Sequence, residues 1–219
     1  MNFNRRKALK IAATGILAVK AAVVLGYAVP GSVVTPAHAV TVDQLMEPQA
    51  LPDMVMGDPN APVTIIEYAS MTCPHCAAFH ETTLPALKEK YIDTGKVKLI
   101  LREFPFDPRA AAAFMLARCA PPEQYYPMVS ALFQQQKTWS SAENAAVPLL
   151  QIAKLAGFTQ EKFEACLKDQ ELLNKVRAVF KKASEEYGVE STPTFFINGE
   201  KTSGTLSIEE MSKIIDKNL

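Results

Sequence analysis

The sequence predicts an α/β fold in which an all-helical block interrupts a small central sheet. Apolar, β-branched runs of strand length are confined to three segments, 63–68, 97–101 and 194–197. Between the second and the third lie about 80 residues rich in Ala, Leu, Gln and Lys, with apolar residues at helical spacing. The chain has 219 residues, 48% of them hydrophobic, which is enough to bury the core of such a fold.

The first part of the sheet is predicted to be a strand–helix–strand unit. Val63–Tyr68 (VTIIEY) is a short β-branched and apolar run, typical of a strand that is covered on both faces. Apolar residues then recur at helical spacing over 73–91, where Pro85 is expected to kink the helix. Val97–Leu101 follows as the second strand. A βαβ unit of this length implies that its two strands pair in parallel.

The C-terminal segment is predicted to be a ββα unit. Thr194–Ile197 is strand-like, Asn198-Gly199 is a hairpin signal, and residues 200–203 pair back. Ser207 begins the last helix with a capping box. A hairpin and one helix bury too little apolar surface alone, so this unit should return to the first sheet. The βαβ and ββα units are the two halves of a thioredoxin fold, with a mixed central sheet and an inserted all-helical domain.

The helices of the insertion are expected at 110–119, 123–136, 143–156, 160–168 and 170–187. The domain boundaries that follow divide the chain into five segments. They are a cleavable export signal peptide (1–39), an extended N-terminal arm (40–60), the first half of the thioredoxin domain (61–106), the inserted helical domain (107–188) and the second half (189–219).

The N-terminal segment indicates export. A basic start is followed by the apolar run Ile11–Val29 and by Ala37-His38-Ala39, the small-x-small pattern of a signal-peptidase site. The paired Arg5 and Arg6 resemble a twin-arginine signal, and the general secretory route is the alternative. An uncleaved membrane anchor is a further alternative, although Lys20 would be costly within a membrane span.

Charge excludes one class of function. The net charge is zero, but residues 1–39 hold five basic side chains and no acidic one. The remaining chain therefore carries 23 acidic against 18 basic side chains. A net negative body argues against nucleic-acid binding, which needs a basic face.

The sharpest chemical signal is Cys73-Pro74-His75-Cys76, at the start of the first helix and just after a strand. At a helix N-terminus, unpaired N–H groups and the helix dipole stabilise a thiolate, so Cys73 should have a lowered pKa and act as the nucleophile. Pro74 suits the first helical position. Cys76, one turn later, is placed to resolve a disulfide, and His75 can add charge or a hydrogen bond near the sulfur of Cys73.

Two alternatives to a redox pair are a structural disulfide and half of a zinc site. Zinc would need two more clustered ligands. The other two cysteines, Cys119 and Cys166, stand alone in the sequence. A C-x-x-C motif beside a βαβ unit favours redox chemistry, and no metal site is predicted.

Three stretches together resemble the DsbA family of thiol–disulfide oxidoreductases. They are Cys73 to Cys76, the preceding Glu67-Tyr68-Ala69-Ser70, and Ser191 to Gly199 (STPTFFING). The resemblance extends over essentially all of residues 40–219. It implies a periplasmic enzyme that introduces disulfide bonds into reduced exported proteins, without a metal or organic cofactor. It also implies a quinone-coupled membrane partner that reoxidises the enzyme.

The same resemblance implies roles for further residues. Pro193 would be a cis proline facing the cysteines, with Thr192 beside it contacting the substrate backbone; an ordinary trans proline is the alternative. Glu67 would exchange protons with Cys76 from beneath the site, the alternative being a glutamate that faces water.

Cys119 and Cys166 would form a second, structural disulfide, as some members of the family do. Two buried free thiols are the alternative, because free cysteine packs as a small hydrophobic side chain. In an oxidising compartment the bond is favoured.

The sequence therefore predicts a monomeric disulfide oxidase. Two alternatives are a disulfide isomerase or reductase of the same fold and a binding or chaperone module whose cysteine pair is only structural. Isomerases of this kind generally add an N-terminal dimerisation domain, and about twenty residues separate Val40 from the first strand. The Cys73 pKa separates a catalytic from a structural thiol.

Overall fold

A computed structural model of the chain describes residues 40–219. The predicted export signal and the alternative membrane anchor fall on residues 1–39, outside the described residues. Within 40–219, no helix combines the length and the apolar character needed to cross a membrane.

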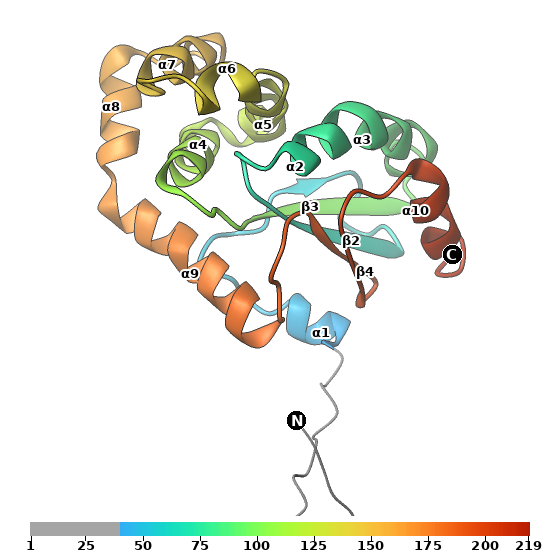
Figure 1. Ribbon diagram of the computed structural model, residues 1–219. Coiled ribbons are helices and arrows are strands. Elements are labelled where there is room, and N and C mark those ends of the chain that lie inside the picture. The colour runs from blue at the N-terminus through green and yellow to red at the C-terminus, as the bar shows by residue number, and fades with distance from the viewer. Residues whose placement is uncertain (1–39) are drawn as a thin grey trace, which may run out of the picture. The chain divides into compact units, whose positions relative to one another are not determined.

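A mixed five-stranded sheet forms the centre of the described residues (Figure 1). Its strand order is β1-β3-β2-β4-β5. The central strands β2 and β3 are parallel, and the other neighbours are antiparallel. The predicted thioredoxin fold with a mixed sheet is confirmed. The strands are β1 (Val55–Met56), β2 (Val63–Ala69), β3 (Val97–Glu103), β4 (Thr194–Ile197) and β5 (Glu200–Ser203).

The central strand β2 is buried along all seven of its residues. Neighbouring side chains on a strand point to opposite faces, and accordingly Ile65 and Ile66 belong to two different hydrophobic clusters. The predominantly apolar run in the sequence therefore reflects a strand that is covered on both faces, as predicted.

One face of the sheet is covered by the helical run 74–92 and by α10 (Ile208–Ile215) (Figure 1). The run is continuous, as predicted, but it contains two π-helical segments. Pro85 follows the first of these, and its missing N–H cannot bond to the carbonyl four residues earlier, which favours such an irregular turn. The run comprises α2 (Pro74–Ala78), a π-helical segment (Phe79–Thr83), α3 (Leu84–Leu87) and a second π-helical segment (Lys88–Ile92).

The opposite face is covered by α9 (Gln170–Glu186), which leads from the helical insertion back to the sheet (Figure 1). The helix predicted over 123–136 divides, because Gln135 leaves helical geometry with φ −103 and ψ 13. The remaining insertion comprises α4 (Pro108–Cys119), a 3-10 turn (Pro122–Gln124), α5 (Tyr125–Gln134), α6 (Gln136–Ser140), α7 (Ala146–Leu155) and α8 (Gln160–Lys168).

The segment 40–60 differs from the predicted extended arm. It contains the one-turn helix α1 (Val42–Leu45), where Thr41 and Gln44 form a capping box, and the strand β1, which pairs with β3. The Thr41-x-x-Gln44 pattern is visible in the sequence and could have indicated the helix. β1 is only two residues long, so its existence depends on the partner strand.

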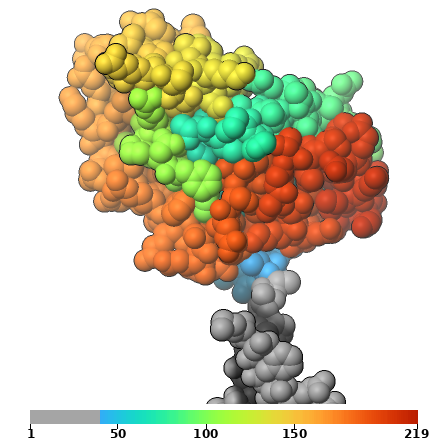
Figure 2. Space-filling model, viewed as in Figure 1, coloured from blue at the N-terminus to red at the C-terminus, as the bar shows by residue number. Residues whose placement is uncertain are grey.

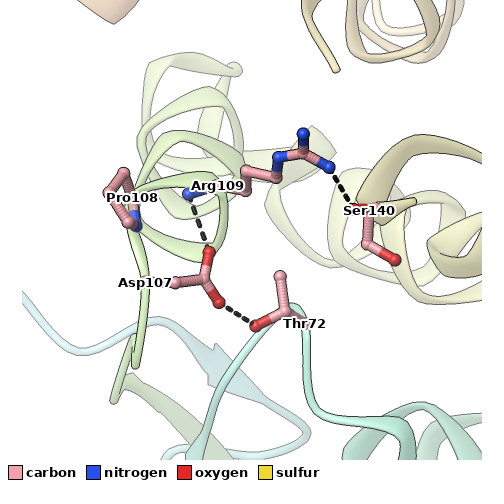
Figure 3. A pocket seen from close by; sticks show the side chains of 5 residues that line it. All are labelled: Thr72, Asp107, Pro108, Arg109 and Ser140. Atoms are coloured by element: carbon pink, nitrogen blue, oxygen red, sulfur yellow. Dashed lines mark hydrogen bonds between the residues drawn. The ribbon is translucent and has the colours of Figure 1, made fainter. Parts of the chain in front are cut away.

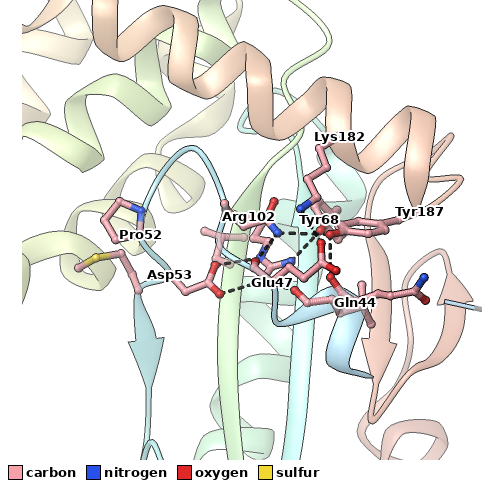
Figure 4. A network of polar contacts seen from close by, with 12 residues as sticks. Gln44, Glu47, Pro52, Asp53, Tyr68, Arg102, Lys182 and Tyr187 are labelled. Carbon is pink, nitrogen blue, oxygen red and sulfur yellow. Dashed lines mark hydrogen bonds and ion pairs between the residues drawn. The ribbon is translucent and has the colours of Figure 1, made fainter. Parts of the chain in front are cut away.

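Arg102 connects this N-terminal segment to the sheet through hydrogen bonds (Figure 4). Its side chain is 1% exposed and makes two hydrogen bonds to Asp53, of 2.9 and 2.7 Å. It also donates to the Tyr68 hydroxyl at 2.9 Å and to the Leu45 carbonyl at 2.7 Å. A buried guanidinium would be costly without such partners, so this network favours one position for residues 45–53.

Candidate active site

Cys73 lies at the N-cap of α2, as the sequence predicts. Its φ of −76 and ψ of 120 are extended, and Pro74 occupies the first helical position. The loop that leads there from β2 is closed by a hydrogen bond from the Cys73 N–H to the Ser70 carbonyl, 3.0 Å long. In the space-filling view α2 lies at the surface, where the helical insertion and the C-terminal strands meet (Figure 2).

The sulfur of Cys73 is surrounded by groups that favour the thiolate. They lower the pKa of Cys73 from 9.0 to about 5. The largest cause is a hydrogen bond from the Cys76 thiol. The Thr192 side chain and the backbone N–H groups of Cys76 and His75 act in the same direction, against the opposing effect of burial. The protonated thiol instead donates to the Thr192 carbonyl, 3.3 Å away.

The imidazole of His75 is exposed, and within residues 40–219 it makes no hydrogen bond. His75 acts on Cys73 here through its backbone N–H. A role for its side chain stays a prediction.

Cys76 has the opposite environment. It is 0% exposed, whereas Cys73 is partly accessible, and both are free thiols in this structure. Burial, then the hydrogen bond to Cys73, then the charge of Glu67 raise the pKa of Cys76 well above its ordinary value. The pair is therefore asymmetric: the partly accessible sulfur is stabilised as an anion and the buried sulfur keeps its proton.

The loop before β4 faces Cys73. The Thr192–Pro193 peptide bond is cis. Thr192 is 8% exposed, and its hydroxyl is buried with no other hydrogen-bond partner in the described residues, so the sulfur of Cys73 is the group it can serve. The antiparallel pairing of Tyr68 with Thr194 brings this loop beside the end of β2.

Glu67 lies in β2 between Leu101 of β3 and Phe195 of β4, and it is 0% exposed. The alternative of a glutamate that faces water is therefore wrong. Its Oε2 atom lies 2.9 Å from Nε2 of His80, and its Oε1 atom is buried without a partner. Sequence reasoning did not single out His80, although its position four residues after Cys76 was a signal.

Two side chains of the helical insertion hold the active-site loop, and sequence reasoning missed both. The amide of Gln136 is buried and donates to the carbonyls of Met71 and Cys73, each at 2.9 Å. Asp107 caps α4 and accepts a 2.5 Å hydrogen bond from the Thr72 hydroxyl (Figure 3). No short-range pattern identifies such contacts, because 35 residues separate Thr72 from Asp107.

An open pocket of about 490 Å³ adjoins this loop. It is lined by Thr72, Asp107, Pro108, Arg109 and Ser140 (Figure 3). The guanidinium of Arg109 donates to the Ser140 carbonyl at its edge. Thr72, one of its lining residues, directly precedes Cys73 in the sequence.

Cys119 and Cys166 form a disulfide with a Cα–Cα distance of 6.1 Å. It joins the end of α4 to α8, far in the sequence from the active-site pair. In residues 40–219, no group of three or more His, Cys, Asp or Glu side chains is arranged to hold a metal ion.

Comparisons with known proteins agree with this geometry. The thioredoxin family matches residues 49–217. A putative protein-disulfide oxidoreductase of Rickettsia typhi is 34% identical over 168 residues, which are 76% of this chain and 62% of that protein. A probable disulfide bond formation protein D of Bacillus anthracis is 31% identical over 171 residues, covering 75% of this chain and 77% of the relative.

Among solved structures, alpha-DsbA1 of Wolbachia pipientis has 37% sequence identity and a TM-score of 0.74. The match covers 81% of this chain and 95% of that one. The fold and the Cys-x-x-Cys pair at a helix N-terminus thus define a member of the thioredoxin family. Within that family, the chain belongs to the DsbA group of thiol–disulfide oxidoreductases.

Proposed function

We propose that this chain is a disulfide oxidase that introduces disulfide bonds into exported proteins. One observation carries the proposal: the pKa of Cys73 is lowered to about 5 while that of the buried Cys76 is raised. A stabilised Cys73 thiolate favours the reduced enzyme over its disulfide. The oxidised enzyme is then a strong oxidant of other thiols.

The working form holds a Cys73–Cys76 disulfide. A substrate thiolate attacks the sulfur of Cys73, the Cys73–Cys76 bond breaks, and its electron pair passes to the sulfur of Cys76. Cys73 is then joined to the substrate in a mixed disulfide. The second substrate thiolate attacks the substrate sulfur and expels Cys73 as a thiolate. The substrate is oxidised by two electrons, and the enzyme is reduced by the same two.

Accessibility supports these roles. Cys73 is the more exposed sulfur, so it is the one that a protein substrate reaches. Cys76 is buried; it leaves when the substrate attacks Cys73, and it resolves the mixed disulfide that Cys73 forms with the reoxidising partner. Thr192 and Pro193 would line the substrate chain, which pairs with this loop through its backbone. The exposed His75 would stabilise the Cys73 thiolate when its imidazole turns towards it.

Glu67 would exchange a proton with Cys76. When the disulfide re-forms, Cys76 must lose its proton in an interior from which water is excluded. The buried carboxylate near this sulfur is the acceptor that the described residues offer.

The same proposal includes the compartment in which the enzyme acts, its substrates and its reoxidising partner. We place it in the periplasm as a monomer, delivered by a cleavable signal peptide of the twin-arginine or the general secretory type. Reduced exported proteins would be its substrates, and a quinone-coupled membrane protein would reoxidise it. The chain spans 62% of the length of the Rickettsia typhi relative. Its substrates and its reoxidising partner are therefore part of this proposal and are not taken over from that relative.

The test is the reduction potential of the mature protein, residues 40–219, equilibrated in glutathione buffers. We expect a value more oxidising than about −180 mV, above protein disulfide isomerase. Oxidation of a reduced, unfolded protein should follow at the same time. A potential near or below about −270 mV would contradict the oxidase and favour a reductase. Efficient rearrangement of scrambled disulfides, without net oxidation, would favour an isomerase.

A further inference from the structure

His80 is a buried titratable side chain that the reaction above does not use. Its side chain is 3% exposed, and Nε2 lies 2.9 Å from Oε2 of Glu67, which is 0% exposed. One ring face packs against Phe133 of α5, with 4.2 Å between ring centroids. His80 also stands in the π-helical segment Phe79–Thr83, an irregularity that is frequent at functional sites.

The pair differs chemically from a buried carboxylate alone. A free carboxylate binds a proton only in mildly acidic solution, whereas an imidazole binds one close to neutral pH. A carboxylate hydrogen-bonded to an imidazole can therefore hold one extra proton under physiological conditions. With this proton bound, the carboxylate and the imidazolium form an ion pair, which adds no net charge to the interior.

Two observations connect the pair with the sulfur that needs a proton. Glu67 is close enough to Cys76 for its charge to raise the pKa of that thiol. His80 follows Cys76 by four residues on the same helical run, and such residues lie on one face. The Oε1 atom of Glu67 is buried and has no hydrogen-bond partner among the described residues, so it is free to reach a neighbouring proton carrier.

We propose that His80 is a positioning residue that stores, together with Glu67, the proton exchanged with Cys76. This inference rests on the proposed thiol–disulfide exchange but not on its direction. When the Cys73–Cys76 bond breaks, the electron pair on Cys76 takes the proton that the pair holds. The pair changes from neutral to a single negative charge, and Cys76 changes from thiolate to thiol. Re-formation of the disulfide returns the proton.

The other groups around the imidazole do not compete for this proton. Phe79 and Phe133 carry no charge. On α5, burial is the largest cause that raises the pKa of Tyr125 and of Tyr126, so both hydroxyls stay neutral. The charges that act on Tyr125, Arg118 and Glu103, are paired with each other, with 2.5 Å between Nε and Oε1. On its own helical run the nearest titratable residues are Cys76, the exposed Glu81 and the exposed His75.

Two measurements on the unaltered protein test the role of His80. Residues 40–219 contain two histidines, His75 and His80, so the imidazole signals can be followed individually by NMR as the pH of the oxidised protein is varied. In parallel, the rate of reduction by glutathione is measured and divided by the thiolate fraction of the reagent. We expect this corrected rate to fall about a hundredfold with rising pH, the low end of general acid catalysis. The midpoint of that fall should coincide with the titration of His80.

Variants separate this role from a structural one. His80→Gln can still donate a hydrogen bond to Glu67 but holds no proton, so its corrected rate should be independent of pH and equal to the high-pH rate of the wild type. Glu67→Gln should also lose the pH dependence. Glu81→Gln removes an exposed acid next to His80 and should keep the pH dependence of the corrected rate. If His80→Gln fails to fold, the coincidence of the two wild-type midpoints still decides the question.

A His80 signal that does not titrate between pH 5 and 9 would overturn the proposal. A corrected rate without a fall at the His80 midpoint would do the same. Neither measurement depends on whether the enzyme is an oxidase or an isomerase. A reducing potential would therefore reject only the proposed function, and a missing His80 titration only this inference.

Discussion

Acidifying the reduced protein should destabilise it relative to the oxidised protein. The pKa of Cys73 is lowered in the folded, reduced state from 9.0 to about 5. A group with a lowered folded pKa contributes stability that is complete above its unfolded value and is lost as the pH falls to its folded value. The stability that Cys73 contributes should therefore decline from about pH 9 to about pH 5. The oxidised protein has no thiol there and lacks this contribution.

The size of the effect follows from the shift. At 1.36 kcal/mol per pKa unit, a fall from pH 7 to pH 5 removes at most about 3 kcal/mol. Cys73 is only half buried, and solvent screens its partners, which reduces this figure. We expect the reduced protein to lose about 1–2 kcal/mol more than the oxidised protein over this interval.

The assay is urea unfolding of both redox forms at pH 5, 6 and 7. Comparing the two forms removes the contribution of carboxylates that titrate equally in both. Reduced Cys73→Ser serves as the control and should show no extra loss on acidification. The pH dependence of Cys73 alkylation by iodoacetamide supplies an independent midpoint. A midpoint at pH 8 or above, or equal pH dependence of the two forms, would refute the reasoning.

Three further predictions concern the surroundings of the site. Asp53→Asn leaves Arg102 buried without its counter-charge and should cost about 3 kcal/mol of unfolding free energy in urea, with Cys73 alkylation unchanged. Gln136→Leu removes the donor to two loop carbonyls; it should cost about 2 kcal/mol and raise the alkylation midpoint of Cys73. The double variant Cys119→Ser/Cys166→Ser opens a loop with a sequence separation of 47 and should lower stability by about 2–4 kcal/mol, measured by thermal and urea unfolding.

Much of the fold could be predicted because its signals are local. Val63–Tyr68 and Val97–Leu101 are predominantly apolar and β-branched, as expected for a parallel pair that is covered on both faces. Ser207 begins α10 through the capping box with Glu210 that the sequence displays. The segment 40–60 was harder, because β1 has only two residues and forms through its pairing with β3.

The candidate active site also has features that could be predicted from the sequence and features that could not. The position of Cys73 at a helix N-terminus could be predicted from Pro74 and the preceding strand, since capping depends on neighbouring residues. The contacts of Gln136 and Asp107 with the active-site loop could not, because they join segments 35 or more residues apart. One polar side chain within a helical stretch carries no sign of its partner.

The sequence by itself determined the βαβ and ββα units, the redox pair and the helix that stabilises its thiolate, because these depend on residues that are close together in the chain. Only the tertiary structure decided the environment of the second sulfur. Burial of Cys76, the hydrogen bond between Glu67 and His80, and the loop of Thr192 and Pro193 arise where β2, β4 and the helical run 74–92 meet. The protonation of a buried group depends on what surrounds it in space, and chain separation does not reveal those neighbours.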